Sequence, residues 1–125
     1  MSKTVLICDD EAYILESVKY VVQKEGFHVI TGDDGEKALA LAREHKPALA
    51  VLDIGMPGLD GLEVLAEIRA DEALRGMLVL LLTAKAQESD VRRGYDSGAD
   101  AYVKKPFSPA ELSTRVRGLL DPAAS

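Results

Sequence analysis

Acidic side chains follow two apolar runs of this chain, at the point where each run stops. Val5–Cys8 leads into three adjacent carboxylates, which are Asp9, Asp10 and Glu11. The run 48–52 leads into a single carboxylate, Asp53. Three carboxylates at the end of a buried strand are costly unless a cation offsets them. The alternative for each acid is structural, because aspartate is common as a helix N-cap and in turns.

Two further polar groups follow later apolar runs. The run 77–82 ends before Thr83, which offers a hydroxyl, and the short run 101–103 leads into Lys104 and Lys105. A carboxylate nucleophile, a hydroxyl and an ammonium are together suited to a transferring phosphoryl group. Thr83 also has a structural alternative, as an N-cap or a β-branched strand residue.

The elements that must position these groups alternate regularly. Apolar, β-branched runs predict strands, and apolar residues at helical spacing predict helices between them. The strands are expected at 5–8, 27–30, 48–53, 77–82 and 101–103. The helices are expected at 12–25, 36–45, 62–71, 88–97 and 110–120. Because a helix separates each pair of strands, the pattern predicts an α/β fold with a parallel sheet covered on both faces.

A doubly wound sheet would bring the polar groups together. In a five-stranded sheet of order 2-1-3-4-5, the first and third strands are neighbours, and ligands bind beyond the carboxyl ends of the strands. Asp9, Asp10 and Asp53 would then share one crevice, where they cannot all stay ionised without a cation. Oxygen ligands suit a hard ion such as Mg²⁺.

The composition limits the other function classes. The 125 residues fit one domain, and the net charge of -6 argues against nucleic-acid binding by the domain itself, which needs clustered Lys and Arg. No apolar run is long enough to span a bilayer, and the first residues lack the apolar stretch of a signal peptide. The single cysteine, Cys8, excludes an internal disulfide. We therefore expect a cytoplasmic domain that binds neither membrane nor nucleic acid directly.

Several short motifs stand out at the strand ends and turns. They are Asp9-Asp10-Glu11, Asp53, Met56-Pro57-Gly58-Leu59-Asp60-Gly61, Thr83-Ala84, Gly98-Ala99-Asp100-Ala101-Tyr102 and Lys105-Pro106-Phe107. Any one of them is weak evidence, but their order and spacing are specific. In this combination the chain resembles the receiver domain of two-component response regulators. The resemblance covers residues 3–120, leaves 121–125 as a tail, and implies the flavodoxin-like (βα)5 fold. A stand-alone receiver and a piece of a longer regulator both remain open.

The resemblance implies a role for each group at the strand ends. Asp53 matches the aspartate that accepts phosphate from a sensor histidine kinase or a histidine phosphotransfer protein. Asp9, Asp10 and the backbone carbonyl of Gly55 match the Mg²⁺ ligands that act with Asp53, and Mn²⁺ can take the place of Mg²⁺. Lys105 matches the lysine that pairs with the phosphoryl group, and in the family its bond to the next proline is cis. We expect a phosphoacceptor that promotes its own phosphorylation and slow dephosphorylation, not an enzyme acting on other substrates.

The resemblance also implies a switch. Thr83 matches the hydroxyl that turns toward the phosphoryl group, and Tyr102 matches the aromatic that then turns inward, although Tyr102 has a plain strand aromatic as its alternative. The switch would alter the face made by the fourth helix, fifth strand and fifth helix, where an effector or a second, phosphorylated copy would bind. The basic residues expected on that face are Arg92, Arg93, Lys104, Arg115 and Arg117.

Two positions are expected to tune hydrolysis of the acyl phosphate. Gly55 lies two residues after Asp53 and has no side chain, so it leaves the phosphoryl group open to water or a partner. Lys85 lies two residues after Thr83, where its long side chain could reach over the same group. We expect Lys85 to slow hydrolysis by occupying the approach of the water.

Three other functions fit parts of the pattern. An aspartyl phosphatase resembling the haloacid dehalogenases needs a second acid two residues after the nucleophile, where this chain has Gly55. A receiver-like interaction module would not need all five polar groups, which this chain keeps. Flavin binding on this fold needs a phosphate-cradling loop after the first strand, where this chain has acids. Phosphorylation with a small donor distinguishes the receiver from these alternatives.

Overall fold

The computed structural model describes residues 3–84 and 98–121 and contains the predicted parallel sheet. The strands are β1 (Thr4–Cys8), β2 (His28–Gly32), β3 (Leu49–Asp53), β4 (Leu78–Ala84) and β5 (Ala101–Lys105). The described helices are α1 (Ala12–Lys24), α2 (Gly35–His45), α3 (Gly61–Ala70) and α5 (Pro109–Leu120). All strand pairs are parallel and the order is β2-β1-β3-β4-β5, which confirms the doubly wound α/β prediction. The helix expected at 88–97 lies outside the described residues.

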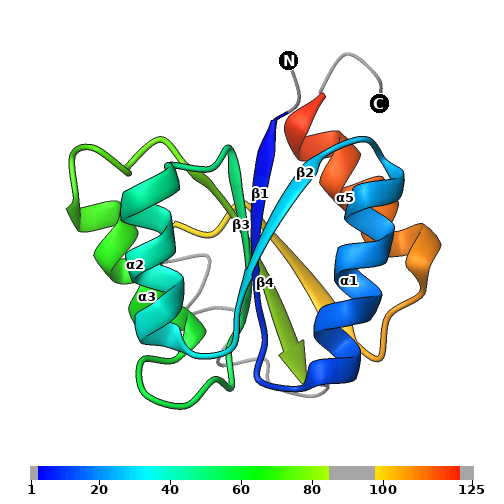
Figure 1. The fold of residues 1–125 in the computed structure, drawn as a ribbon, viewed down its shortest axis with the longest axis horizontal. Helices are drawn as coiled ribbons and strands as arrows, with labels where there is room; N and C mark the ends of the chain where they lie inside the picture. The colour runs from blue at the N-terminus through cyan, green and yellow to red at the C-terminus, as the bar shows by residue number, and fades with distance from the viewer. Residues whose placement is uncertain (1–2, 85–97, 122–125) are drawn as a thin grey trace.

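Two pairs of helices cover the two faces of the sheet. Figure 1 shows α2 and α3 on one side of the strands and α1 and α5 on the other. Strand residues alternate between these faces: Ala50 and Leu52 of β3 pack with α2 and α3, whereas Leu49 and Val51 pack with α1 and α5. Because both faces are buried, the central strands are apolar throughout, as parallel strands require.

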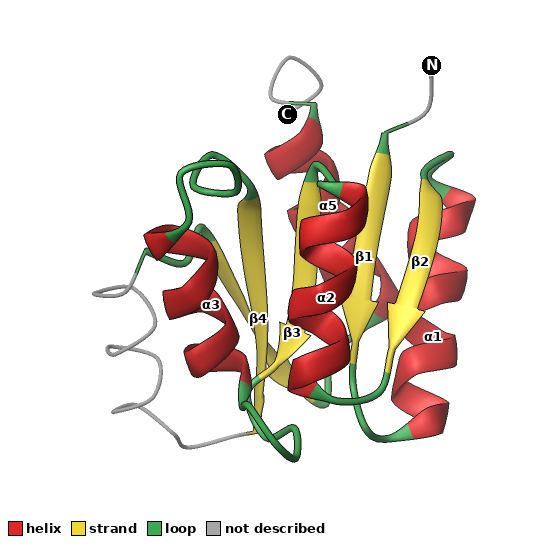
Figure 2. Ribbon diagram, turned by 60° about the vertical axis from the view of Figure 1, so that its left-hand side comes forward, coloured by secondary structure: helices red, strands yellow, loops and turns green. Residues whose placement is uncertain are grey.

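Local sequence signals begin the helices where they are needed. Asp60 is the N-cap of α3 and accepts from the Glu63 backbone N–H, while the Glu63 side chain accepts from the Asp60 N–H. Ser108 is the N-cap of α5, where its side chain accepts from the Glu111 backbone N–H, and Pro109 lies in the first turn. These caps set the loops that follow β3 and β5, at the lower edge of the sheet in Figure 2. Within the described residues, no helix is long and apolar enough to cross a membrane.

The first and third strands differ from their predicted limits by one residue at the start, and the other three differ by up to two residues at their ends. The strand predicted at 27–30 lies at His28–Gly32, and those predicted to end at residues 82 and 103 continue to Ala84 and Lys105. The reason is the backbone ladder, which pairs Thr83 with Lys104 and Ala84 with Lys105 beyond the apolar run. Side-chain polarity therefore marked the end of the apolar core and not the end of the strand.

One residue predicted on the basic output face, Arg117, is exposed but also contacts a neighbouring helix end. Arg117, expected on the basic output face, lies with its Nε 3.2 Å from Glu25 Oε1 at the end of α1. Glu25 also accepts a hydrogen bond of 2.6 Å from Ser113 of α5. These contacts join α1 to α5. Lys104, Arg115 and Arg117 are all exposed, whereas Arg92 and Arg93 lie outside the described residues.

Candidate functional site

The alternation of the strands brings the predicted site residues to one edge of the sheet. On the face covered by α1 and α5, the rows of β1, β3 and β5 end in Ile7, Val51 and Val103. Two residues further along each row are Asp9, Asp53 and Lys105, which therefore continue the same face past the apolar core. The packing that buries the core thus aligns two carboxylates and one ammonium.

Lys105 lies at the centre of this group. Its Nζ is 2.9 Å from Asp9 Oδ2, 3.2 Å from Asp53 Oδ1 and 3.4 Å from Glu11 Oε1. Burial alone would lower the pKa of Lys105, but the contacts and charges of Asp9 and Asp53 outweigh it and raise the pKa above its usual value. Lys105 is therefore a permanent cation at this edge. Its peptide bond to Pro106 is cis, as the resemblance implied.

Burial and mutual repulsion raise the pKa values of two of the acids. Asp53 is 5% exposed, and burial, followed by the charge of Asp9, raises its pKa. The pKa of Asp10 is raised as well, first by burial and then by its contact with Asp53. The Asp53 carboxylate also accepts a 3.2 Å hydrogen bond from the Gly55 backbone N–H, which acts in the opposite direction. The cluster carries more negative charge than Lys105 alone can offset.

The oxygens of this cluster fit a hard divalent cation. One carboxylate oxygen each from Asp9, Asp10 and Asp53 lie within 4.8 Å of one another. Asp9 is fully buried, and its Oδ2 makes no hydrogen bond of good geometry although the Lys105 ammonium is nearby. A buried carboxylate oxygen in that state is suited to a metal ligand. The Gly55 carbonyl stays a predicted fourth ligand.

The two predicted switch residues share the other face of the sheet. Thr83 is 1% exposed and follows Leu81 by two residues in β4, on the face packed by α2 and α3. Tyr102 pairs with Leu81 in the neighbouring strand and is buried in the same apolar cluster. The backbone therefore places Thr83 beside the sheet edge that carries Asp53 and Tyr102 in the neighbouring strand, as a switch requires. Their movement stays a prediction.

Two glycines near Asp53 differ in how much space they have. A Cβ at Gly55 would meet only the Asp53 carboxylate oxygens, at 3.9 Å, which agrees with an open approach to the site. A Cβ at Gly61 would lie 2.6 Å from the Asp53 backbone oxygen, so α3 can begin there only with glycine. Lys85, the other predicted hydrolysis-tuning residue, lies outside the described residues.

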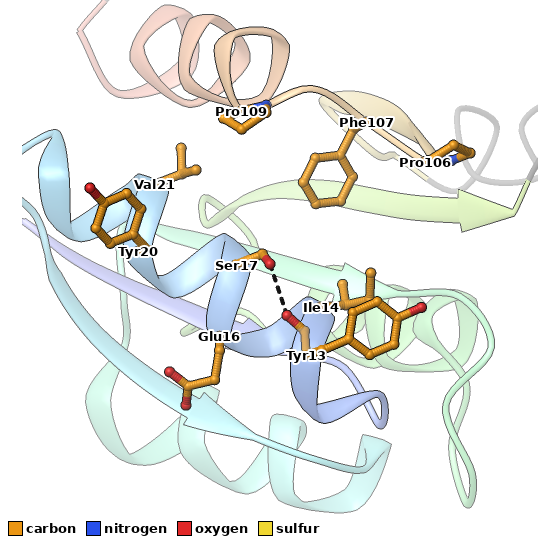
Figure 3. A pocket seen from close by; sticks show the side chains of 9 residues that line it. All are labelled: Tyr13, Ile14, Glu16, Ser17, Tyr20, Val21, Pro106, Phe107 and Pro109. Carbon is orange, nitrogen blue, oxygen red and sulfur yellow. Dashed lines mark hydrogen bonds between the residues drawn. The ribbon is translucent and has the colours of Figure 1, made fainter.

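An apolar groove that the sequence did not reveal adjoins the site. It has a volume of about 490 Å³ and lies between α1 and the segment that follows Lys105 (Figure 3). Its lining residues are Tyr13, Ile14, Glu16, Ser17, Tyr20, Val21, Pro106, Phe107 and Pro109. Tyr13 and Tyr20 are 69% and 63% exposed, unusual for such large side chains. The only signal in the sequence is two aromatics seven residues apart on one helix.

Glu11 was also missed as a member of the site. The sequence places it beside the metal-binding acids, but only the structure shows its contact with Lys105, 94 residues away. A hydrogen bond from the Tyr13 hydroxyl to Glu11, followed by the charge of Glu11, raises the pKa of Tyr13. Glu11 therefore lies between the acidic cluster and the groove.

Comparison with known proteins agrees with the site. The family model of the response regulator receiver domain matches residues 5–117. The chain is 43% identical over 120 residues to the alkaline phosphatase synthesis transcriptional regulatory protein PhoP of Bacillus subtilis, covering 96% of this chain and 49% of that protein. It thus spans about half the length of that relative.

Solved structures agree as well. A putative response regulator from Chloroflexus aurantiacus has a TM-score of 0.91 and 32% identity, covering 96% of this chain and 98% of that one. The receiver domain of a sensor histidine kinase from Pseudomonas aeruginosa, with magnesium coordinated in its active-site cleft, has a TM-score of 0.85 and 27% identity, covering 94% and 96%. With its fold, its acid cluster and the family match together, this chain belongs to the receiver domains of two-component response regulators.

Proposed function

We propose that this phosphoacceptor domain takes a phosphoryl group onto Asp53 from a phosphohistidine and thereby changes the partners it binds. The observation that carries the proposal is the meeting of buried Asp53, two further acids and Lys105 at one sheet edge. We place this exchange in the cytoplasm, because a single buried thiol suits a reducing compartment. An aspartyl phosphatase is disfavoured, since Gly55 stands where its second acid would be.

The residues divide the chemistry between them. An Asp53 carboxylate oxygen forms the new bond to phosphorus as the bond from phosphorus to the donor imidazole nitrogen breaks and its electron pair stays on nitrogen. Asp9, Asp10, Asp53 and the Gly55 carbonyl would hold Mg²⁺ or Mn²⁺, which supplies charge neutralisation between the two anions. Lys105 stabilises the charge on the phosphoryl oxygens as a second fixed cation.

The histidine donor has to reach Asp53 from outside, and the apolar groove is the surface that fits it. The groove begins at Pro106 and Phe107, directly after Lys105, and is bounded by Tyr13 and Tyr20 on α1. A donor helix packed there would bury both exposed tyrosines and hold its imidazole near the sheet edge. We propose a histidine kinase or histidine phosphotransfer protein as this partner.

The product would act on the opposite face of the sheet. An acyl phosphate adds about two negative charges at Asp53. Thr83 can turn its hydroxyl toward them, and the buried Tyr102 can follow in the space that it leaves. The exposed surfaces of β5 and α5, together with the helix that the sequence predicts at 88–97, would then bind an effector or a second phosphorylated copy.

Slow hydrolysis completes the proposed cycle. Gly55 leaves the site accessible to water, and Lys85 is proposed to restrict that access. The proposal for Lys85 rests on its sequence position, two residues after Thr83. The Lys85→Ala variant should lose its acyl phosphate faster than wild type, and an equal half-life would refute this part of the proposal.

The function can be tested with a small donor. Wild type and Asp53→Ala are incubated with acetyl phosphate and either Mg²⁺ or EDTA, and the intact mass is measured. We expect the mass of one phosphoryl group on wild type with Mg²⁺ and none on the variant or with EDTA. No mass gain by wild type, with equal partner binding before and after treatment, would show an interaction module instead.

A further inference from the structure

The side chain of Glu11 does not serve the helix that it begins. Glu11 is the N-cap of α1, but its carboxylate makes no capping hydrogen bond. N-cap side chains usually accept from the first turn of their own helix. Here the Glu11 carboxylate instead lies 3.4 Å from Lys105 Nζ, at the other end of the chain. Its position is therefore better explained by Lys105 than by the stability of α1.

Glu11 differs from the other two carboxylates that contact Lys105. Asp9 and Asp53 belong to the group of oxygens suited to a divalent cation, whereas Glu11 does not. Any cation that uses Asp9 and Asp53 competes with Lys105 for their charge, and Glu11 remains as its carboxylate partner. Lys105 is only 14% exposed in its side chain, so it has little room to turn to water instead.

We propose that Glu11 is a positioning residue that holds the Lys105 ammonium at the site and gives it up when Asp53 carries a phosphoryl group. The inference rests on the proposed phosphoacceptor function and adds a carboxylate that competes with the phosphoryl group for Lys105. Glu11 and the phosphoryl oxygens are alternative partners for one ammonium, so the carboxylate lowers the affinity of the site for phosphoryl groups. The negative charge of Glu11 also raises the affinity of the site for a cation.

This arrangement gives two effects of opposite sign. Loss of the Glu11 charge should weaken cation binding and strengthen binding of an anionic phosphoryl analogue. Glu11 is 45% exposed, so solvent screens its charge, and we expect about a threefold change in each affinity. A residue needed only for folding, or a direct metal ligand, would not change the two affinities in opposite directions.

The test compares Glu11→Gln with Glu36→Gln, which removes the same charge from an exposed position on α2, away from the three carboxylates that contact Lys105. Isothermal titration measures the Kd of Mg²⁺, and fluorine NMR measures the Kd of beryllofluoride at saturating Mg²⁺. For Glu11→Gln we expect the Mg²⁺ Kd to rise about threefold and the beryllofluoride Kd to fall about threefold. For Glu36→Gln we expect both constants to stay near wild type.

The results distinguish failure of the proposed role of Glu11 from failure of the proposed phosphoacceptor function. If wild type binds both ligands and Glu11→Gln weakens both or matches Glu36→Gln, the role of Glu11 is refuted while the phosphoacceptor function stands. If wild type binds neither Mg²⁺ nor beryllofluoride, the proposed function fails and the role of Glu11 fails with it.

Discussion

Gly61 connects the stability of the domain to the geometry of its phosphorylation site. It is the first residue of α3, and its N–H donates a 3.1 Å hydrogen bond to the Ile54 carbonyl. A Cβ added at Gly61 would lie 2.6 Å from the Asp53 backbone oxygen and 2.9 Å from Ile54 Cα. Both neighbours are backbone atoms, which cannot move away by changing a rotamer. The Gly61→Ala change must therefore displace α3 or the end of β3.

The expected cost follows from two opposing contributions. Overpacking at a rigid site costs about 1–3 kcal/mol or more. Alanine offsets part of this, because it favours a helix over glycine by about 1 kcal/mol in a helix interior and by less at the first position. We expect Gly61→Ala to lower the free energy of unfolding by about 2 kcal/mol, or about 8 °C in Tm.

A matched variant makes this prediction sharp. Gly118 lies inside α5, and a Cβ there would meet nothing within 4 Å. Gly118→Ala should therefore raise the free energy of unfolding by about 0.5–1 kcal/mol. Urea unfolding followed by circular dichroism measures both variants, and phosphorylation by acetyl phosphate should be slower in Gly61→Ala alone. If Gly61→Ala is as stable as wild type, the contact reasoning is wrong.

Three further predictions concern the side chains of Arg69, Asp53 and Cys8. Urea unfolding tests the first two, and reaction with a disulfide reagent tests the third. Arg69 donates five hydrogen bonds, four of them to backbone carbonyls, so Arg69→Gln should lower the free energy of unfolding by about 3 kcal/mol. The control Arg43→Gln loses only exposed ion pairs of 3.8 Å and should change it by less than about 0.5 kcal/mol. Equal effects of the two changes would contradict this prediction. The folded state raises the pKa of Asp53, so the stability that this group contributes is present at acid pH and is lost as the pH rises. In EDTA, the free energy of unfolding of Asp53→Asn relative to wild type should therefore increase from about pH 4 to about pH 7. A decrease would contradict the assigned burial of Asp53. Burial raises the pKa of Cys8 to about 12, so a disulfide reagent should modify it only after unfolding, and rapid reaction of the native protein would contradict its placement.

Short patterns in the sequence predicted the parallel α/β sheet and the polar groups at its strand ends, whereas the order 2-1-3-4-5 follows from the doubly wound fold that the resemblance implies. Apolar runs of β-branched residues alternate with helical spacing, and strand order places the first and third strands together. Asp9, Asp10 and Asp53 could thus be assigned to one crevice from the positions of the strand ends within that order, and the structure brings one carboxylate oxygen of each within 4.8 Å of the others. Periodicity predicts where the strands end, and the fold class predicts which strands are neighbours.

Long-range side-chain contacts could not be predicted in this way. Arg69 looks like an ordinary basic residue at a helix end, yet it binds Gly98 and Asp100 across the sheet edge. Arg117 looks like part of a basic surface, yet it contacts Glu25 of α1. Each side chain has several partners within reach, and only the packing of the helices decides between them.

The central claim is that Asp53 accepts the phosphoryl group, and chemical trapping tests it most directly. Borohydride reduces an aspartyl phosphate to homoserine, so protein treated with acetyl phosphate and Mg²⁺ can be reduced, digested and sequenced by mass spectrometry. We predict homoserine at position 53 alone, and none after pretreatment with EDTA. Homoserine at Asp9 or Asp10, or uptake of phosphate by Asp53→Asn at the wild-type rate, would contradict the account.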